Sequence, residues 1–160
     1  MTAETKPFFV VSSGRSGTAM MQRLFGCFPQ AEIHHEYMVD HIQPIAVKYH
    51  MGIAGLGETM QVLRHTHAAA IYYSDALLWG DSSNKLSWII PALDRVFPEA
   101  RFVHLIRDGR KVASSYFHKL GDECYDDQST GVLQRYYDAR GELPAPPPEK
   151  KYWWPLPPRG

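Results

Sequence analysis

The sequence lacks the features that mark several large classes of protein. Its 160 residues include only two cysteines, Cys27 and Cys124, too few for a disulfide framework or a cysteine-ligated metal site. The formal net charge is zero, so no overall field attracts nucleic acid or an anionic membrane, and any attraction for anions must be local. No apolar run approaches the roughly 20 residues that span a bilayer, and the polar N-terminus lacks a signal-peptide pattern. We therefore expect a soluble, cytoplasmic protein without a nucleic-acid or membrane partner.

The composition predicts one globular domain with a distinct C-terminal segment. Hydrophobic residues make up 44% of the chain, and 160 residues are enough for a single domain with a core of its own. Seven of the twelve prolines fall between Pro144 and Pro158. Such a segment favours extended polyproline II or irregular structure. We predict a domain over residues 1–140 and a proline-rich tail over 141–160.

Short apolar runs alternate with stretches of helical periodicity, which predicts an α/β fold. Each expected strand is followed by at least one expected helix, so the strands can pair in one parallel sheet. The expected strands cover Phe8–Val11, an extended segment at Ala31–Tyr37, Leu77–Gly80 and Arg101–Ile106. The expected helices cover Met20–Phe28, Val39–His50, Leu56–Ala70, Ser87–Phe97 and Lys111–Lys119, with a further one around Val132–Tyr137.

The turn between the first expected strand and helix has the properties of an anion site. Its backbone N–H groups converge near a helix N-terminus, where the helix dipole adds about half a positive charge. Arg15 adds a permanent cation with a planar fork that suits phosphate or sulfate oxygens. A phosphate-bearing ligand is the natural occupant. The candidate binding residues are Gly14, Arg15, Ser16, Gly17, Thr18 and Ala19.

This turn departs from the two best-known nucleotide loops. A nucleoside-triphosphatase loop needs lysine directly after its last glycine, but Thr18 follows Gly17 here. The glycine fingerprint of dinucleotide-binding proteins is also absent. A magnesium-dependent triphosphatase is therefore disfavoured, and a nucleotide-binding phosphotransferase or kinase of the P-loop type stays as an alternative.

A second junction of the same kind lies later in the chain. The strand expected at Arg101–Ile106 ends on Arg107, and Ser115 lies on the second turn of the helix that follows. Both side chains can point into the crevice beyond the carboxyl ends of the strands, where ligands bind in open α/β sheets. The alternative to a ligand-binding role is a structural one, in which Arg107 forms an ion pair with Asp108 and this pair caps the helix.

Together the two junctions resemble the sulfotransferase family, which uses 3′-phosphoadenosine 5′-phosphosulfate (PAPS) as sulfuryl donor and releases the bisphosphate PAP. The segment Arg15–Thr18 looks like the family's 5′-phosphosulfate loop, and Arg107 with Ser115 looks like its 3′-phosphate motif. The resemblance covers residues 8–118. It implies a P-loop-like, three-layer α/β/α fold with a central parallel sheet, a hydroxyl acceptor on a small molecule or peptide, and no metal.

Finer details are similar to the tyrosylprotein sulfotransferases and related bacterial enzymes. These details are the arginine in the first loop, the pair Asn84-Lys85, and the sequence Arg107-Asp108-Gly109-Arg110. The resemblance implies that Arg15 and Lys85 stabilise charge on the leaving phosphate oxygen. It also implies that Glu36, twenty-one residues after Arg15, is the base that takes the acceptor's proton.

Histidines next to Glu36 are rivals for the role of base, because the cytosolic sulfotransferases use histidine. Side chains alternate along an extended segment, so His34 and Glu36 are expected on one face and His35 on the other. We favour Glu36 over His34. The spacing of the histidines is too generic to indicate a metal site.

The chain is short for a sulfotransferase domain. The family's later element, which closes over the nucleotide, has no match after Tyr137. An inactive fragment that binds PAP is therefore a second alternative, and we expect slow transfer unless a second subunit completes the site. The sequence leaves open the identity of the acceptor and whether the protein forms a homo-oligomer.

Overall fold

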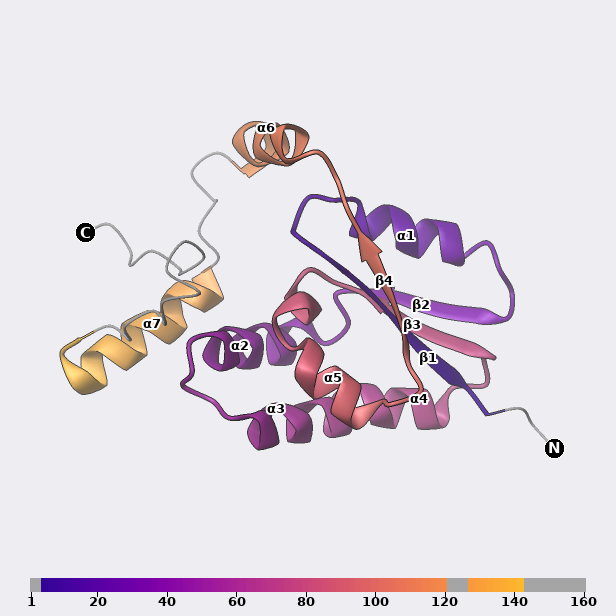
Figure 1. Cartoon of the computed structure of the whole chain (residues 1–160), viewed down its shortest axis with the longest axis horizontal. Helices are drawn as coiled ribbons and strands as arrows, with labels where there is room; N and C mark the ends of the chain where they lie inside the picture. The colour runs from indigo at the N-terminus through magenta and orange to yellow at the C-terminus, as the bar shows by residue number, and fades with distance from the viewer. Residues whose placement is uncertain (1–3, 121–126, 143–160) are drawn as a thin grey trace.

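The computed structural model describes residues 4–120 and 127–142 and is built around one parallel sheet (Figure 1). The sheet has four strands in the order β2-β3-β1-β4, and every neighbouring pair is parallel. The predicted tail over 141–160 lies almost wholly outside the described residues. The strands are β1 (Lys6–Ser12), β2 (Ala31–His35), β3 (Leu78–Ser82) and β4 (Arg101–Leu105).

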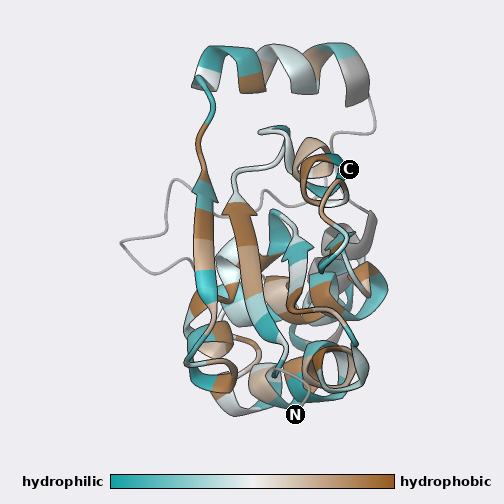
Figure 2. Cartoon of the chain, turned by 90° about the vertical axis from the view of Figure 1, so that its right-hand side faces the viewer, coloured by the Kyte–Doolittle hydropathy of each residue, from teal (hydrophilic) through white to brown (hydrophobic). Residues whose placement is uncertain are grey.

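Strand β1 lies inside the sheet and is buried on both faces. Phe9 and Val11 belong to the larger core cluster, which includes Trp79 from β3. Phe8 and Val10 belong to a second cluster on the opposite face. Because successive side chains point to opposite faces of a strand, a strand covered on both sides needs an uninterrupted apolar sequence. Figure 2 shows this continuous hydrophobic strand in the middle of the molecule.

Helices cover both faces of the sheet, which confirms the predicted three-layer α/β/α architecture with a central parallel sheet. Among the described helices, α1 covers one face and the group from α2 to α5 covers the other (Figure 1). Helix α6 lies beyond the carboxyl ends of the strands, as Figures 1 and 2 both show. The helices are α1 (Thr18–Phe25), α2 (Val39–His50), α3 (Leu56–Leu63), α4 (Ala69–Tyr73), α5 (Ile90–Val96), α6 (Gly109–Leu120) and α7 (Asp127–Arg140).

The prediction for Val39–His50 is confirmed at both ends, but two other predicted helices are divided. The predicted helix Leu56–Ala70 continues to Tyr73 and contains a π-helical turn, η1 (Arg64–Ala68), between α3 and α4. The predicted helix Ser87–Phe97 becomes a 3₁₀ turn, η2 (Lys85–Trp88), followed by α5. Proline in the first turn of α5 explains this second break, since proline favours a helix start and lacks the N–H that an uninterrupted helix needs.

The remaining differences lie at the ends of elements. The predicted helix Met20–Phe28 starts earlier, at Thr18, and stops at Phe25, with Gly26 as its C-cap. The predicted extended segment Ala31–Tyr37 ends as a strand at His35. Within the described residues, no helix combines the length and apolar character needed to cross a membrane.

We predict that Gly80→Ala destabilises the fold. Gly80 lies opposite Phe8 across the β1–β3 pair, and a Cβ added at Gly80 would collide with the Phe8 ring. Forcing extra volume into a packed core costs about 1–3 kcal/mol. Urea unfolding should show this loss. Gly57→Ala is the control, because Gly57 is exposed on α3 with no atom near its added Cβ; equal stability of the two variants would contradict the prediction.

Candidate functional site

The first expected anion site forms where β1 ends and α1 begins. Gly17 has a φ of 109°, a left-handed conformation that glycine adopts without strain, and its carbonyl accepts the N–H groups of Met20 and Met21. The hydroxyl of Ser82 donates to the carbonyl of Thr18 over 2.9 Å, which ties the start of α1 to β3. The first amides of a helix have no acceptor within that helix, so those of Thr18 and Ala19, which precede the two bonded amides, are available to an anion.

The connections from neighbouring strands leave this end of the sheet on opposite sides. The chain after β1 goes to α1 on one face, whereas the chain after β3 goes to α5 on the other (Figure 1). Ligands of open α/β sheets bind at such a switch point. Here the two connections touch, because the Ser12 N–H donates to the Ser87 hydroxyl over 2.9 Å and that hydroxyl donates back to the Ser12 carbonyl.

The two predicted anion motifs meet, although they lie far apart in the sequence. The Arg107 guanidinium donates to the Arg15 carbonyl over 2.8 Å, and Nε of Arg15 donates to the Ser115 hydroxyl over 3.2 Å. Gly14 lies under α6 so closely that a Cβ on it would collide with the Tyr116 hydroxyl. The loop after β1 and the start of α6 therefore form one site.

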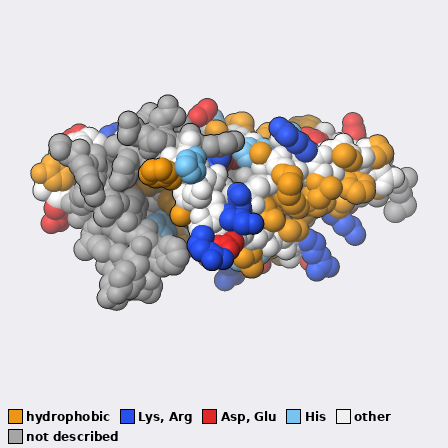
Figure 3. Space-filling model, turned by 90° about the horizontal axis from the view of Figure 1, so that it is seen from above, with side chains coloured by type: hydrophobic (Ala, Val, Ile, Leu, Met, Phe, Trp, Pro, Cys, Tyr) orange, Lys and Arg blue, Asp and Glu red, His pale blue; other side chains and the backbone are white. Residues whose placement is uncertain are grey.

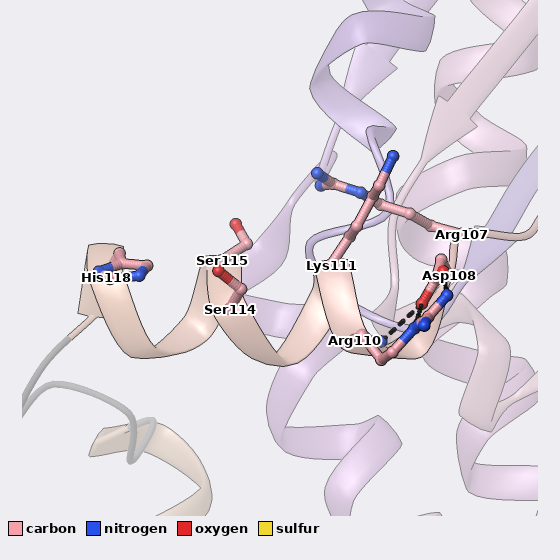
Figure 4. Close-up of a pocket in the computed structure, with 7 residues that line it drawn as sticks. All are labelled: Arg107, Asp108, Arg110, Lys111, Ser114, Ser115 and His118. Carbon is pink, nitrogen blue, oxygen red and sulfur yellow. Dashed lines mark hydrogen bonds and ion pairs between the residues drawn. The ribbon is translucent and has the colours of Figure 1, made fainter.

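An open pocket of about 510 Å³ lies along α6, and Arg107 and Ser115 are among the residues that line it. In Figure 4, Arg107 and Lys111 extend away from the helix start, while Arg110 folds back on Asp108. The Arg110–Asp108 ion pair measures 2.7 Å, and this hydrogen-bonded contact lowers the pKa of Asp108. Asp108 thus pairs with Arg110, and Arg107 is directed to the carbonyl of Arg15 instead.

The surface above this end of the sheet is locally cationic although the net charge is zero. Figure 3 looks down on it and shows Lys and Arg side chains next to an apolar area. Arg107 and Lys111 are exposed, and Arg15 is half-buried beneath them. Because an opposite charge is attracted more strongly where water is partly excluded, Arg15 is the cation whose interaction with an anion is screened least.

Glu36 follows β2 directly and has an unusual backbone. Its φ is 56° and that of Arg15 is 62°, so two of the three candidate catalytic residues adopt the left-handed conformation that disfavours a Cβ. Such residues concentrate at functional sites. Glu36 is half-buried, and its carboxylate makes no hydrogen bond or ion pair within the described part of the chain. The expected alternation stops at His35, because Glu36 is no longer extended.

The two neighbouring histidines have different surroundings. His34 lies 2.8 Å from the Glu32 carboxylate, and its ring packs against Trp79 at a centroid distance of 5.2 Å. Nε2 of His35 lies 3.0 Å from the hydroxyl of Thr18, at the anion loop. His35 is therefore the histidine that contacts the anion loop. The sequence had instead indicated His34 as the alternative to Glu36 for the role of base.

Lys85 begins η2, which Ser83 and Asn84 separate from the end of β3. Its N–H donates to the Ser83 hydroxyl over 3.1 Å, and the Ser83 N–H donates to the Val10 carbonyl. The preceding residue, Asn84, lies next to Gly14, since a Cβ on that glycine would be 2.9 Å from its side-chain nitrogen. The backbone of Lys85 thus lies beside the loop that carries Arg15.

Comparison with known proteins adds an independent observation. A model of the sulfotransferase family matches residues 7–145, which include both anion motifs, Glu36 and Lys85. The chain belongs to the sulfotransferase family. No curated protein and no solved structure matches it.

Several residues of the candidate site were missed by reasoning from the sequence. The α6 pocket is also lined by Lys111, Ser114 and His118. A signal was present, because these residues recur at the three- and four-residue spacing of one helix face. His35 could not be found in this way, since its partner Thr18 lies on another element. In the described ranges, no group of three or more His, Cys, Asp or Glu side chains is arranged to hold a metal ion.

We predict that Glu32 stabilises this sulfotransferase above about pH 4.5. Partial burial acts to raise its pKa, but hydrogen bonds from Ser74 and His34 outweigh it and lower the pKa from 4.5. A lowered pKa in the folded state gives stability that is present above the unfolded value and is lost as the pH falls through the folded value. The Tm difference between the unaltered protein and Glu32→Gln should therefore shrink from pH 5 to pH 3.

Since Glu32 is partly exposed, the effect should stay below about 1 kcal/mol. Glu99→Gln, at an exposed position on the connection before β4, is the control and should show no such change. A Tm difference for Glu32→Gln that stays constant with pH would contradict the prediction.

Proposed function

We propose that this chain transfers the sulfuryl group of PAPS to a hydroxyl acceptor. The observation that carries the proposal is the contact between the two anion motifs: Arg107 donates to the carbonyl of Arg15, and Arg15 donates to Ser115. A ligand with two separate phosphate groups can engage both motifs at once. PAPS is such a ligand, and membership of the sulfotransferase family favours it over other nucleotides.

The two ends of the donor engage different parts of the site. The 5′-phosphosulfate binds the loop residues Gly14–Ala19, where the first amides of α1 and the Arg15 side chain supply donors. The 3′-phosphate binds Arg107 and Ser115 in the α6 pocket. Lys111 lines the same pocket and adds a second cation for this phosphate.

The reaction is an in-line displacement at sulfur. The acceptor oxygen forms a bond to sulfur while the bond between sulfur and the 5′-phosphate oxygen breaks, and the bonding electrons stay on that oxygen. Negative charge therefore develops on the leaving PAP, as in phosphoryl transfer, where positioning and charge stabilisation dominate. Arg15 is placed to stabilise this charge, and Lys85 is the second cation for it.

Glu36 takes the proton that the acceptor hydroxyl loses. A general base must be free to accept a proton, and the Glu36 carboxylate has no competing partner within the described residues. His34 is a weaker candidate because Glu32 already occupies its Nε2 at 2.8 Å. We assign the acceptor to the class of phenolic or alcoholic hydroxyls on a small molecule or peptide, with tyrosyl peptides favoured by the motif details.

We predict that the chain binds PAP more tightly than AMP, and that Arg107→Ala removes this preference. Charge-assisted hydrogen bonds contribute about 1.5–3 kcal/mol, so PAP affinity should fall roughly 10- to 150-fold and AMP affinity should hardly change. Calorimetry measures both. Arg101→Ala is the matched control, because it removes an exposed arginine at the far end of β4.

Two outcomes of this binding experiment would overturn the donor assignment. One is equal affinity of the unaltered chain for PAP and AMP. The other is tighter binding of ATP with Mg²⁺ than of PAP, which would favour a phosphotransferase.

We predict that Glu36→Gln lowers turnover roughly a hundredfold or more, with little effect on PAP affinity, whereas Arg15→Ala lowers both. The glutamine cannot accept the proton, but it leaves the phosphate contacts unchanged; Arg15 interacts with the ground state and with the developing charge. Transfer from PAPS to a panel of phenols, alcohols and tyrosyl peptides measures turnover. If Glu36→Gln retains turnover and His34→Ala loses it, the base is His34. Tight PAP binding without transfer to any acceptor would identify a PAP-binding fragment.

A further inference from the structure

A fully buried contact between a histidine and an aspartate lies close to the site and has no place in the chemistry described above. Asp81, in β3, and His67, in η1, are both 0% exposed, and His67 Nε2 lies 3.0 Å from Asp81 Oδ2. Burying a carboxylate is unfavourable unless it is fully paired. Neither residue lines the α6 pocket. The pair must therefore be explained by what else it contacts.

The other carboxylate oxygen of Asp81 holds the turn that carries Glu36. Asp81 Oδ1 accepts the N–H of Tyr37 over 3.1 Å, and the carbonyl of Ser82 accepts the N–H of Glu36 over 3.2 Å. The end of β3 thus binds two successive amides of this turn. The turn needs such support, because Glu36 and Met38 have φ values of 56° and 51°, a conformation that persists only where the surroundings enforce it.

The position of His67 depends on the π-helical turn between α3 and α4. Nδ1 of His67 lies 3.0 Å from the Thr66 hydroxyl, which donates to the Val62 carbonyl over 2.8 Å. Its ring also contacts the edge of Tyr37 at a centroid distance of 5.4 Å. Single π-turns inside α-helices are rare and are frequent at functional sites. Here the π-turn brings the imidazole of His67 within hydrogen-bonding distance of Oδ2 of Asp81.

We propose that Asp81 and His67 are positioning residues that fix the carboxylate of Glu36 relative to the anion loop. His67 holds the Asp81 carboxylate in one orientation, and Asp81 in turn holds the amide that follows Glu36. The proposal rests on the proposed function, in which Glu36 is the base. It adds a role for two buried residues that touch neither the donor nor the acceptor.

The first test measures the turn itself and needs no activity. His67→Leu removes the donor to Asp81, whereas the amide nitrogen of His67→Gln can replace Nε2. Amide hydrogen exchange by NMR should become at least tenfold faster at Tyr37 in His67→Leu, relative to Val10 in the core of β1. It should return toward the original rate in His67→Gln. Leu93→Ala is the control, because it removes a fully buried side chain of α5, which belongs neither to η1 nor to the hydrogen bonds of this network.

The second test asks whether the pair acts through Glu36. His67→Leu should lower turnover with PAPS at least tenfold and change PAP affinity less than twofold, and His67→Gln should recover turnover. In a Glu36→Gln background, His67→Leu should cause no further loss, since residues that act through one group are not additive. If His67→Leu does not fold, Asp81→Asn serves in its place, with a smaller change in the same direction.

The outcomes separate this inference from the proposed function. Unchanged exchange at Tyr37 in His67→Leu, or an equal loss of turnover in the presence and absence of Glu36, would overturn the positioning role while PAP binding stands. Failure of the unaltered chain to bind PAP would overturn the proposed function. In that case, faster exchange at Tyr37 in His67→Leu would still show that His67 stabilises the turn. The turn would then have a structural role only, because Glu36 would no longer be assigned as a base.

Discussion

The site depends on the burial of β1 between two layers of helices. Phe8 and Val10 pack against one layer, and Phe9 and Val11 against the other, so the strand is fixed in position and register. Strand β1 has β3 on one side and β4 on the other, and all three strands are parallel. The chain segments that follow these three strands therefore leave the sheet at the same edge. The anion loop, the segment with Lys85 and the start of α6 are brought together by this constraint alone.

Strained backbone at the site is held by contacts from neighbouring strands. Arg15 is left-handed, and its carbonyl accepts a hydrogen bond from Arg107 beyond β4. Glu36 is also left-handed, and it is held by Ser82 and Asp81 at the end of β3. In both cases the stabilising partner lies on another connection. The geometry of the candidate catalytic residues is therefore a property of the assembled sheet and not of either loop by itself.

This origin of the geometry explains how much the sequence could predict. Local signals were enough for the helix Val39–His50 and for the apolar strand β1, because each depends on residues close together in the chain. The general rule that parallel strands share a carboxyl edge predicted that Arg107 and Ser115 face one crevice, whereas the hydrogen bond from Arg107 to the Arg15 carbonyl was not predicted. The rule predicts which side chains meet but not which atoms pair.

What the sequence could not predict depends on partners that are distant in the chain. Nothing near His67 indicates a π-turn, and Asp81 lies fourteen residues away from it. The alternation argument does not extend to Glu36, since β2 ends at His35 and Glu36 has a positive φ, with its N–H bonded to the Ser82 carbonyl of β3. His35 was passed over because its hydrogen bond is with Thr18 on α1.

The different exposure of the two arginines suits the two roles proposed for them. Arg107 is exposed, so water and salt screen its attraction for a phosphate, which suits the proposed role of recognising the donor in the ground state. Arg15 is half-buried between the loop and α6, where the effective dielectric constant is lower and the same charge interacts more strongly. Charge that develops during transfer is stabilised most by a cation that is already fixed and partly shielded from water. Arg15 has both properties, because Ser115 orients its guanidinium and Arg107 holds its carbonyl.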